Sequence, residues 1–383
     1  MAGAAADSPL LLLQRDAVAS IPDGVAFAWN APTPLPGGVP TFTSSTVLAQ
    51  GAGAAAGGTG ATVIVVRFRV GGSDTYSALV RDAGDRFGEA ATIVPANFDR
   101  LSDPVVAMSA AGTTVVGFDA TRDSGRRAAY VSRLSGNAFG RPRVISLTGA
   151  GPVAAAVGPG ELGLVAWTRA GRAEISTLND RGVASGYRVL GPAAADGDIA
   201  ASGAAGGGIV AWEGPGGAVR MVRRGTSATG RLGAPVGVRK RTGADVSGLS
   251  AALDPDGVAY LTWREGTGAR TRILIARAKP GRRFKIDQVA VGAGLGRPAS
   301  VARPIGGAIV GWAAKAGWQA RKIPTSGGLP IQSTVSSPGT STDVPLARPF
   351  LSAGPGPRAD MTWLQPSSGE AGYDVVQALE NER

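Results

Sequence analysis

Short apolar runs that end in an aromatic residue recur along the whole chain. Eight can be aligned on that last residue: VAFAW (25–29), IVVRF (64–68), TVVGF (114–118), GLVAW (163–167), GIVAW (208–212), AYLTW (259–263), AIVGW (308–312) and ADMTW (359–363). The aromatic anchors follow one another at spacings of about 39 to 51 residues. Each run has strand length, and Gly or Pro interrupts every candidate helical period. The pattern therefore predicts a repeated β-unit.

Within each run, large and small side chains alternate. Residues i and i−2 of a strand share a face, so each anchor lies beside a bulky apolar residue such as Val165 or Leu261. The residue between them is Ala, Gly or Thr in all runs but one, where it is Arg67. One large face and one small face predict a sheet that is packed between two neighbouring sheets.

Three further strand-like segments accompany each run. An apolar stretch precedes it, and an alternating segment such as AEISTL (173–178) and a fourth segment such as RFKIDQVA (283–290) follow it. Four short strands per 40–50 residues are typical of a β-propeller blade, whereas solenoid coils repeat at about 20–30 residues. A sandwich would not require one string eight times. We expect a single all-β propeller domain over residues 1–383, with about eight blades. Seven blades are the alternative, because the first spacing is short and residues 31–60 are poorly patterned.

The two ends of the chain suggest how the ring closes. The last unit runs through YDVVQALE (373–380) and lacks a fourth strand, while the first begins with a spare apolar segment, PLLLLQR (9–15). We expect residues 9–15 to complete the last blade. This pairing would remove an open sheet edge.

The clearest repeat copy is DPDGVAYLTWREGTGARTRILIARAKPGRRF (254–284). Its Asp-Gly turn, Trp, polar hairpin and Arg-rich strand resemble degenerate propeller repeats of actinobacterial secreted proteins. The resemblance implies a propeller and an extracellular or cell-envelope location, and it brings no known active site. The WD dipeptide and the Asp-box of sialidase-like propellers are absent. A cytoplasmic location is the alternative, because the N-terminus lacks the basic region of a signal peptide.

The chain contains neither Cys nor His. Disulfides, zinc sites built from thiolates or imidazoles, and His-assisted nucleophiles are therefore excluded. Asp254 and Asp256 beside Gly257 are interpreted as a tight turn rather than a calcium loop, which needs six to eight oxygens. We predict no metal site and no cofactor. No apolar run approaches the ~20 residues of a transmembrane helix.

Hairpin loops just after the anchors supply candidate site residues. In a propeller, equivalent loops gather on one face, so the cations Arg69, Arg122, Arg169, Arg264 and Lys315 are candidate ligand-binding residues. The acids Asp119, Glu213 and Glu265 are weaker candidates for catalysis. Glycoside hydrolysis needs two carboxylates about 5–10 Å apart, which adjacent blades could supply.

Charge is unevenly distributed. Residues 220–285 hold 15 Lys and Arg and four acids, a net of +11, which equals the formal charge of the whole chain. Arg239, Lys240 and Arg241 lie in this basic segment, which favours an anionic polymer or protein partner. Nucleic acid is disfavoured because few aromatics remain for base stacking.

These observations predict a monomeric, non-catalytic binding or scaffolding propeller for an anionic partner such as an acidic polysaccharide. The alternative is a carboxylate-dependent carbohydrate-active enzyme.

Overall fold

The structure is a computed structural model of the whole chain. It describes residues 28–29, 33–34, 48–56, 61–70, 72–81, 91–109, 111–121, 125–135, 138–158, 163–179, 183–204, 207–225, 231–315, 317–330, 333–335, 349–353, 359–366 and 373–381. Over these residues nearly all regular structure is β-strand, and the single helical turn is the 3-10 turn η2 (Gly268–Arg270). No described helix has the length and apolar character needed to span a membrane.

The described strands form seven antiparallel sheets. In four of them, strands that are consecutive in sequence are also neighbours in the sheet. One contains β3 (Leu48–Ala56), β4 (Thr62–Val70), β5 (Ser73–Arg81) and β6 (Ala91–Phe98), and another contains β13 (Ala150–Val157), β14 (Gly163–Arg169), β15 (Arg172–Leu178) and β16 (Ala184–Pro192). The other two contain β17 (Ile199–Ala204), β18 (Gly207–Gly214), β19 (Ala218–Arg224) and β20 (Val236–Arg239), and β21 (Val246–Leu253), β22 (Ala259–Glu265), β23 (Arg272–Ala278) and β24 (Lys285–Val291).

A fifth such sheet contains β25 (Ala299–Ala302), β26 (Ala308–Ala314), β27 (Gly317–Ile323) and β28 (Ser333–Thr334). Another is built on β9 (Thr114–Thr121) and β10 (Arg127–Ser135), with β7 (Arg100–Leu101), β8 (Val105–Met108), β11 (Ala138–Phe139) and β12 (Arg143–Ser146) at its edges. The last contains β29 (Phe350–Ala353), β30 (Ala359–Pro366) and β31 (Tyr373–Asn381), joined by β1 (Ala28–Trp29) and β2 (Thr33–Pro34).

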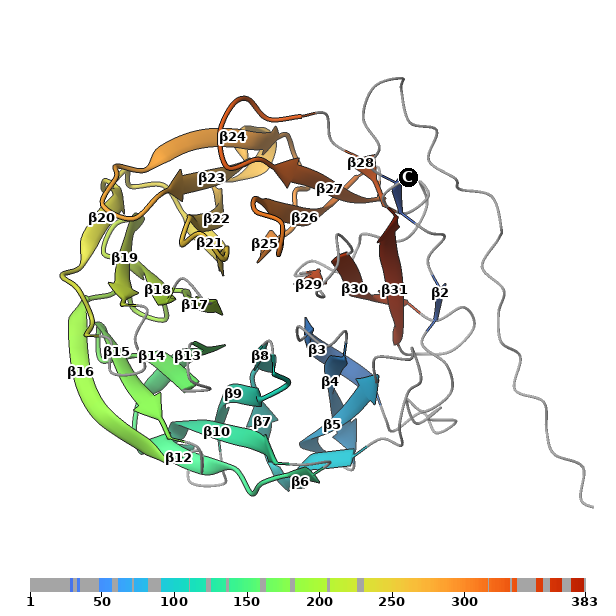
Figure 1. Cartoon of the computed structure of the whole chain (residues 1–383). Helices are drawn as coiled ribbons and strands as arrows, with labels where there is room; N and C mark the ends of the chain where they lie inside the picture. Colours follow the sequence, from blue (N-terminus) through green and yellow to red (C-terminus); the bar gives the residue numbers. More distant parts are fainter. Residues whose placement is uncertain are drawn as a thin grey trace, which may run out of the picture.

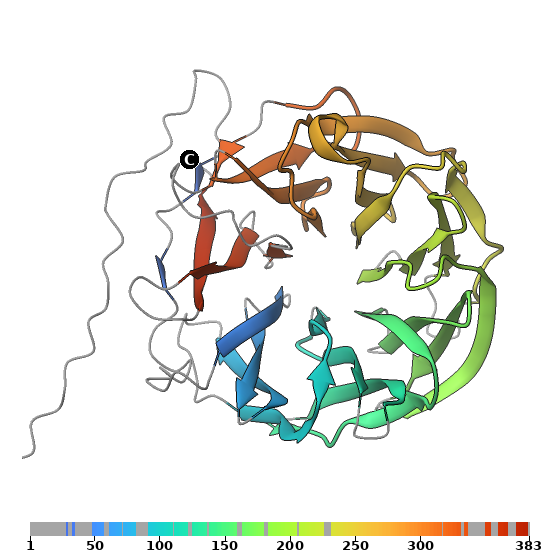
Figure 2. The ribbon, with the colours of Figure 1, turned by 180° about the vertical axis from the view of Figure 1, so that it is seen from behind.

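These sheets stand around a central axis as the blades of a propeller (Figures 1 and 2). The innermost strands contact one another in the order β3, β8, β13, β17, β21, β25 and β29, and β29 contacts β3 again. The all-β propeller fold predicted from the repeated strings is therefore present. The predicted four-strand order is also observed; for example, AEISTL (173–178) lies in β15 and RFKIDQVA (283–290) overlaps β24.

The number of sheets differs from the eight aligned strings for a local reason. Trp29, the first anchor, lies in β1, which pairs with β31 so that Ala28 is opposite Asn381. The first and last strings thus belong to one sheet within the described residues, which agrees with the short first spacing. Residues 9–15, expected to close the ring, lie outside the described residues.

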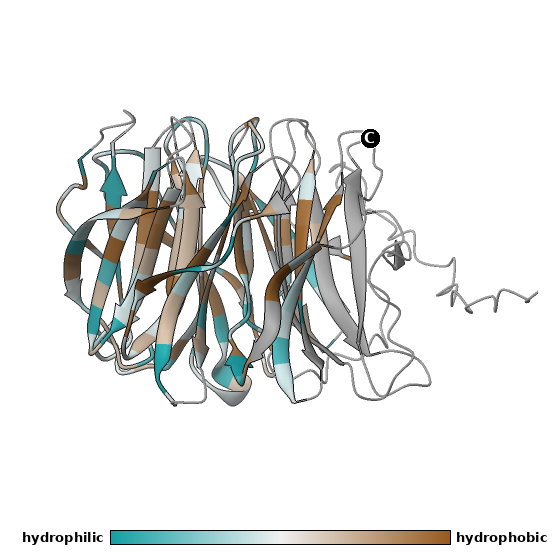
Figure 3. Cartoon of the chain, turned by 90° about the horizontal axis from the view of Figure 1, so that it is seen from below, coloured by the Kyte–Doolittle hydropathy of each residue, from teal (hydrophilic) through white to brown (hydrophobic). Residues whose placement is uncertain are grey.

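Large side chains of one sheet pack on small side chains of the sheet before it. Trp212 and Val210 pack with Ala154 and Ala166 of the preceding sheet, while Trp263 of the following sheet packs with Ala211. This confirms the interpretation of the alternating faces. Hydrophobic stretches lie along many of the strands that Figure 3 colours.

Glycine is required where neighbouring sheets approach closely. A Cβ on Gly203 of β17 would lie 2.1 Å from the carbonyl oxygen of Val157 in β13. A Cβ on Gly117 would lie 3.1 Å from Val153, and one on Gly311 would lie 3.2 Å from Met361. The small residues before the anchors therefore make room for side chains of the next sheet.

The second strand of each sheet defines two faces of the ring. We call the face at which this strand ends the carboxyl face; it contains the hairpins at 170–171 and 215–217. The other, which we call the amino face, contains the turns at 254–257, 279–284 and 324–328. Antiparallel pairing places every loop after a first or third strand on the amino face.

Candidate functional site

The predicted catalytic acid Glu265 is held in an ion-pair network on the carboxyl face. Its carboxylate accepts hydrogen bonds from Arg239 Nη2 at 3.0 Å, Arg272 Nη2 at 2.6 Å and Trp263 Nε1 at 3.4 Å. Burial alone would raise the pKa of Glu265, but the bonds from Arg239 and Trp263 and the charges of both arginines outweigh it and hold the pKa below its usual value. Glu265 is thus an ionised structural group whose two oxygens both have partners.

Glu213, the predicted companion of Glu265, has a different environment. Its Oε2 accepts a hydrogen bond from the Asp198 backbone N at 3.4 Å. Desolvation, together with the nearby charges of Asp198 and Asp245, raises the pKa of Glu213 to about 7. A carboxyl with this pKa suits a general acid, but its predicted partner in hydrolysis, Glu265, is committed to ion pairs.

Asp119, the third predicted acid, is likewise a structural group. It is buried and accepts a hydrogen bond from Arg127 Nε at 2.5 Å. Burial raises the pKa of Asp119 more than Arg127 lowers it. Asp254 also serves a turn, because its carboxylate accepts bonds from Val258 N at 2.8 Å and Tyr260 Oη at 3.1 Å.

The predicted cations after the anchors do not share one environment. Arg169 donates to Glu174 Oε1 from Nε at 3.1 Å and from Nη2 at 3.0 Å, and Tyr187 donates to the same oxygen at 2.8 Å. Arg264 donates to the Leu295 carbonyl at 3.2 Å. Lys315 is exposed in a turn. Arg69 lies near the end of β4, and Arg122 lies outside the described residues.

The basic segment 220–285 is divided between the two faces of the ring. Arg239 is bound to Glu265 on the carboxyl face, and Lys240 and Arg241 follow it there with exposed side chains. Lys279 and the cations up to residue 285 lie on the amino face instead. The sequence places these cations in neighbouring sheets but does not separate the two faces.

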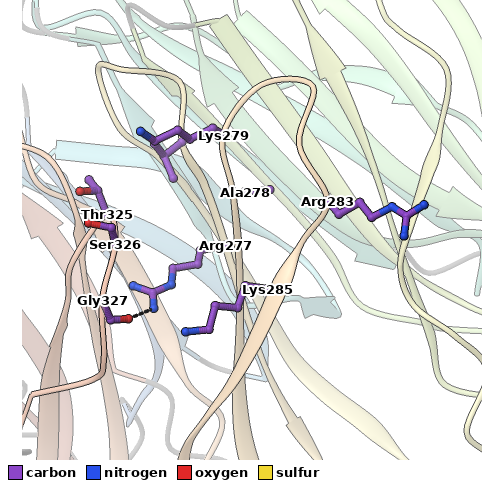
Figure 4. A pocket seen from close by; sticks show the side chains of 9 residues that line it. Arg277, Ala278, Lys279, Arg283, Lys285, Thr325, Ser326 and Gly327 are labelled. Carbon is purple, nitrogen blue, oxygen red and sulfur yellow. Dashed lines mark hydrogen bonds between the residues drawn. The ribbon is translucent and has the colours of Figure 1, made fainter.

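A pocket opens on the amino face between the sheet β21–β24 and the sheet β25–β28 (Figure 4). Its volume is about 270 Å³. The nine lining residues are Val258, Arg277, Ala278, Lys279, Arg283, Lys285, Thr325, Ser326 and Gly327. Four of them are cations and none is acidic, so the pocket is suited to a negatively charged group.

Arg277 fixes the wall of this pocket that belongs to the next sheet. Its side chain is 5% exposed, and Nη1 donates to the Pro324 carbonyl at 2.6 Å while Nη2 donates to the Gly327 carbonyl. The same Nη2 lies 3.2 Å from Asp287 Oδ2. Because Arg277 holds both ends of the 324–327 turn, Thr325 and Ser326 are presented between those two points (Figure 4).

Equivalent arginines join other pairs of sheets in the same way. Arg133, Arg223 and Arg277 each pair with the residue three before an anchor. Arg133 donates to the Asn179 carbonyl at 2.9 Å, and Arg223 donates to the Ala278 carbonyl at 2.8 Å. Each acceptor lies at the end of the third strand of the next sheet. The sequence signal was present, since a long cation recurs at one position of the third segment in four repeats, at Arg133, Arg223, Arg277 and Lys322.

The cations of the pocket differ in how they are bound. Lys285 Nζ lies 3.4 Å from Asp287 Oδ1, and its side chain is 61% exposed. Lys279 and Arg283 are also exposed. In Figure 4, Arg277 and Lys285 point toward the same region, whereas the guanidinium of Arg283 points away from it. The pocket thus combines one buried, fixed cation with exposed lysines that can reach a ligand.

Comparisons with known proteins concern the fold. No family model matches the chain, and no curated protein matches it. A solved protein of unknown function from Dyadobacter fermentans is 12% identical, with a TM-score of 0.55 over 89% of this chain and 96% of that one. A mutant NanB sialidase from Streptococcus pneumoniae is 12% identical, with a TM-score of 0.48 over 87% of this chain and 68% of that one. The lectin of Aleuria aurantia is 11% identical, with a TM-score of 0.46 over 78% of this chain and 99% of that one. At 12% identity, the likeness to the Dyadobacter fermentans protein shows that the two chains share a fold and nothing more.

Proposed function

We propose that this propeller is a non-catalytic binding module for an acidic polysaccharide, which it holds on the amino face with an anionic group in the basic pocket. The observation that carries the proposal is the pocket lining, which includes Arg277, Lys279, Arg283 and Lys285 and no carboxylate. A concave site walled by one sign of charge concentrates ligands of the opposite sign.

The position of the pocket supports binding to a preformed site. It lies between two packed sheets of the ring, and its lining includes the buried residues Val258 and Ala278. Arg277 joins the two walls through hydrogen bonds to the carbonyls of Pro324 and Gly327. A polymer bound there would therefore order few protein groups, and ordering costs affinity.

The carboxyl face supports the non-catalytic part of the proposal. Of the three predicted acids, Glu265 and Asp119 are bound to arginines, and Glu213 has a pKa raised to about 7. A hydrolase of the usual two-carboxylate kind needs an acid and a second free carboxylate in one site. Catalysis is the competing hypothesis, and the experiment below also tests it.

The test measures the binding of negatively charged and neutral dextrans by calorimetry at low ionic strength. We expect the negatively charged dextran to bind and the neutral dextran not to bind. Lys279→Ala with Lys285→Ala should raise Kd about tenfold, which corresponds to about 1.4 kcal/mol. Added salt should weaken binding, and the affinity of the double variant should depend less steeply on salt concentration than that of the wild type.

The matched control is Lys240→Ala with Arg241→Ala, which removes the same number of charges from the carboxyl face. This control should bind within about twofold of the wild type. Equal losses in both double variants would mean that only net charge matters and would overturn the pocket assignment. Release of reducing ends during incubation, abolished by Glu213→Gln, would establish the enzyme instead.

A further inference from the structure

We infer that the amino-face pocket selects a tetrahedral oxyanion ester, sulfate or phosphate, over a carboxylate. This inference rests on the proposed function and adds the chemical class of the anionic group. It comes from which hydrogen-bond donors line the pocket and from which of them are already in use.

The donor arrangement best suited to a carboxylate is already occupied. The paired N–H groups of a guanidinium bind a carboxylate or a phosphate in bidentate fashion, whereas the ammonium of Lys binds a phosphate as a point charge. In Arg277, Nη1 is bound to Pro324, and Nη2 is bound to Gly327 and lies 3.2 Å from Asp287. The side chain is 5% exposed, so Arg277 presents no open pair of N–H groups to a ligand.

The remaining donors are point-like and come from separate elements. Lys279 and Lys285 stand near the end of β23 and at the start of β24, and each ammonium carries three rotatable N–H donors. Thr325 and Ser326 bring hydroxyls from the turn after β27 on the opposite wall (Figure 4). A sulfate or phosphate ester has three exposed oxygens that diverge, and it can accept from both walls at once. A carboxylate has two coplanar oxygens and can satisfy fewer of these donors.

The other guanidinium of the pocket does not alter this preference. Arg283 is exposed, and its guanidinium points away from the region that Arg277 and Lys285 share (Figure 4). Asp287 lies 3.4 Å from Lys285 Nζ and competes with any bound anion for that ammonium. A tetrahedral oxyanion with three oxygens can share Lys285 and still accept from Lys279 and from the hydroxyls.

The experiment compares three dextrans of equal length and charge density: dextran sulfate, dextran phosphate and carboxymethyl dextran. We expect the sulfate or the phosphate, or both, to bind at least tenfold more tightly than the carboxymethyl form. The two oxyanion arms show which ester is preferred. Equal Kd values for all three would overturn this inference and leave the proposed function in place. Failure of all three to bind would refute the proposed function itself.

A second measurement locates the selectivity. Thr325→Val with Ser326→Ala should reduce the ratio of oxyanion to carboxymethyl affinity at least threefold, while affinity for carboxymethyl dextran stays within twofold. Both residues lie in a turn at the surface, and the thermal midpoint confirms that the variant is folded. An unchanged ratio in the folded variant would show that the hydroxyls do not contribute, and would contradict the proposed donor set.

Discussion

Replacing Arg277 with Met should destabilise the ring at one joint between sheets. Met keeps most of the side-chain volume but removes the guanidinium. The change leaves the carbonyls of Pro324 and Gly327 without their donors, and it leaves Asp287 paired only with the exposed Lys285.

The expected size follows from these partners. A hydrogen bond to a charged group contributes about 1.5–3 kcal/mol, and breaking a buried ion pair costs about 3–5 kcal/mol. The Asp287 partner is only partly buried, so we expect a loss of about 4 kcal/mol for Arg277→Met. With an unfolding entropy of about 2.1 cal/mol/K per residue, the 383-residue chain should lose roughly 5 °C in Tm.

The assay is equilibrium unfolding in urea together with scanning calorimetry. Arg283→Met is the matched control, since it removes an exposed guanidinium from the same pocket and should change stability by no more than about 0.5 kcal/mol. Arg277→Lys should lie between the two, because Lys keeps the charge but not the two-pronged geometry. If Arg277→Met unfolds within about 1 kcal/mol of the wild type, the carbonyl contacts do not hold the sheets together and the reasoning fails.

Three other predictions concern single sites. Glu265→Gln should cost about 2 kcal/mol at neutral pH. Because the pKa of Glu265 is lowered by its partners, the wild-type advantage should be present above about pH 4.5 and shrink at lower pH; urea unfolding at pH 3.5 and 7 checks this. Glu213 has its pKa raised from 4.5 to about 7, so the folded state retains a proton that the unfolded state has lost. Wild-type stability should therefore fall between about pH 4.5 and 7, and Glu213→Gln should flatten that decline; an equally steep decline in the variant would assign it elsewhere. Gly203→Ala should cost roughly 3 kcal/mol because its Cβ would meet the Val157 carbonyl, whereas Gly237→Ala, with nothing within 4 Å, should change Tm by less than about 2 °C.

The fold was predictable because equivalent strands in each sheet need the same pattern of large and small residues, so that pattern repeats along the sequence. The anchors and the small residues beside them had to alternate, since each sheet is packed between two others. It was harder to predict that the first string would form part of the last sheet. Trp29 matches the other anchors in type, but its pairing with Glu380 joins segments from opposite ends of the chain.

The site was less predictable because charge alone does not show what a side chain binds. Arg239 and Lys240 are adjacent in sequence, yet one is bound to the buried Glu265 and the other is exposed. Arg277 reads as one of many arginines, although it bonds to a turn about 50 residues later in the chain. A linear pattern cannot separate these roles, since they depend on which turn of the next sheet lies within reach.

The antiparallel pairing of β1 with β31 has a practical consequence for engineering. Ala28 lies opposite Asn381, which is the arrangement found at the end of a β-hairpin. In a variant that lacks residues 1–27, a two- or three-residue linker could therefore join these two positions as a β-hairpin. New termini could then be opened at the exposed segment 241–243, giving a circular permutant in which every sheet keeps both of its neighbours.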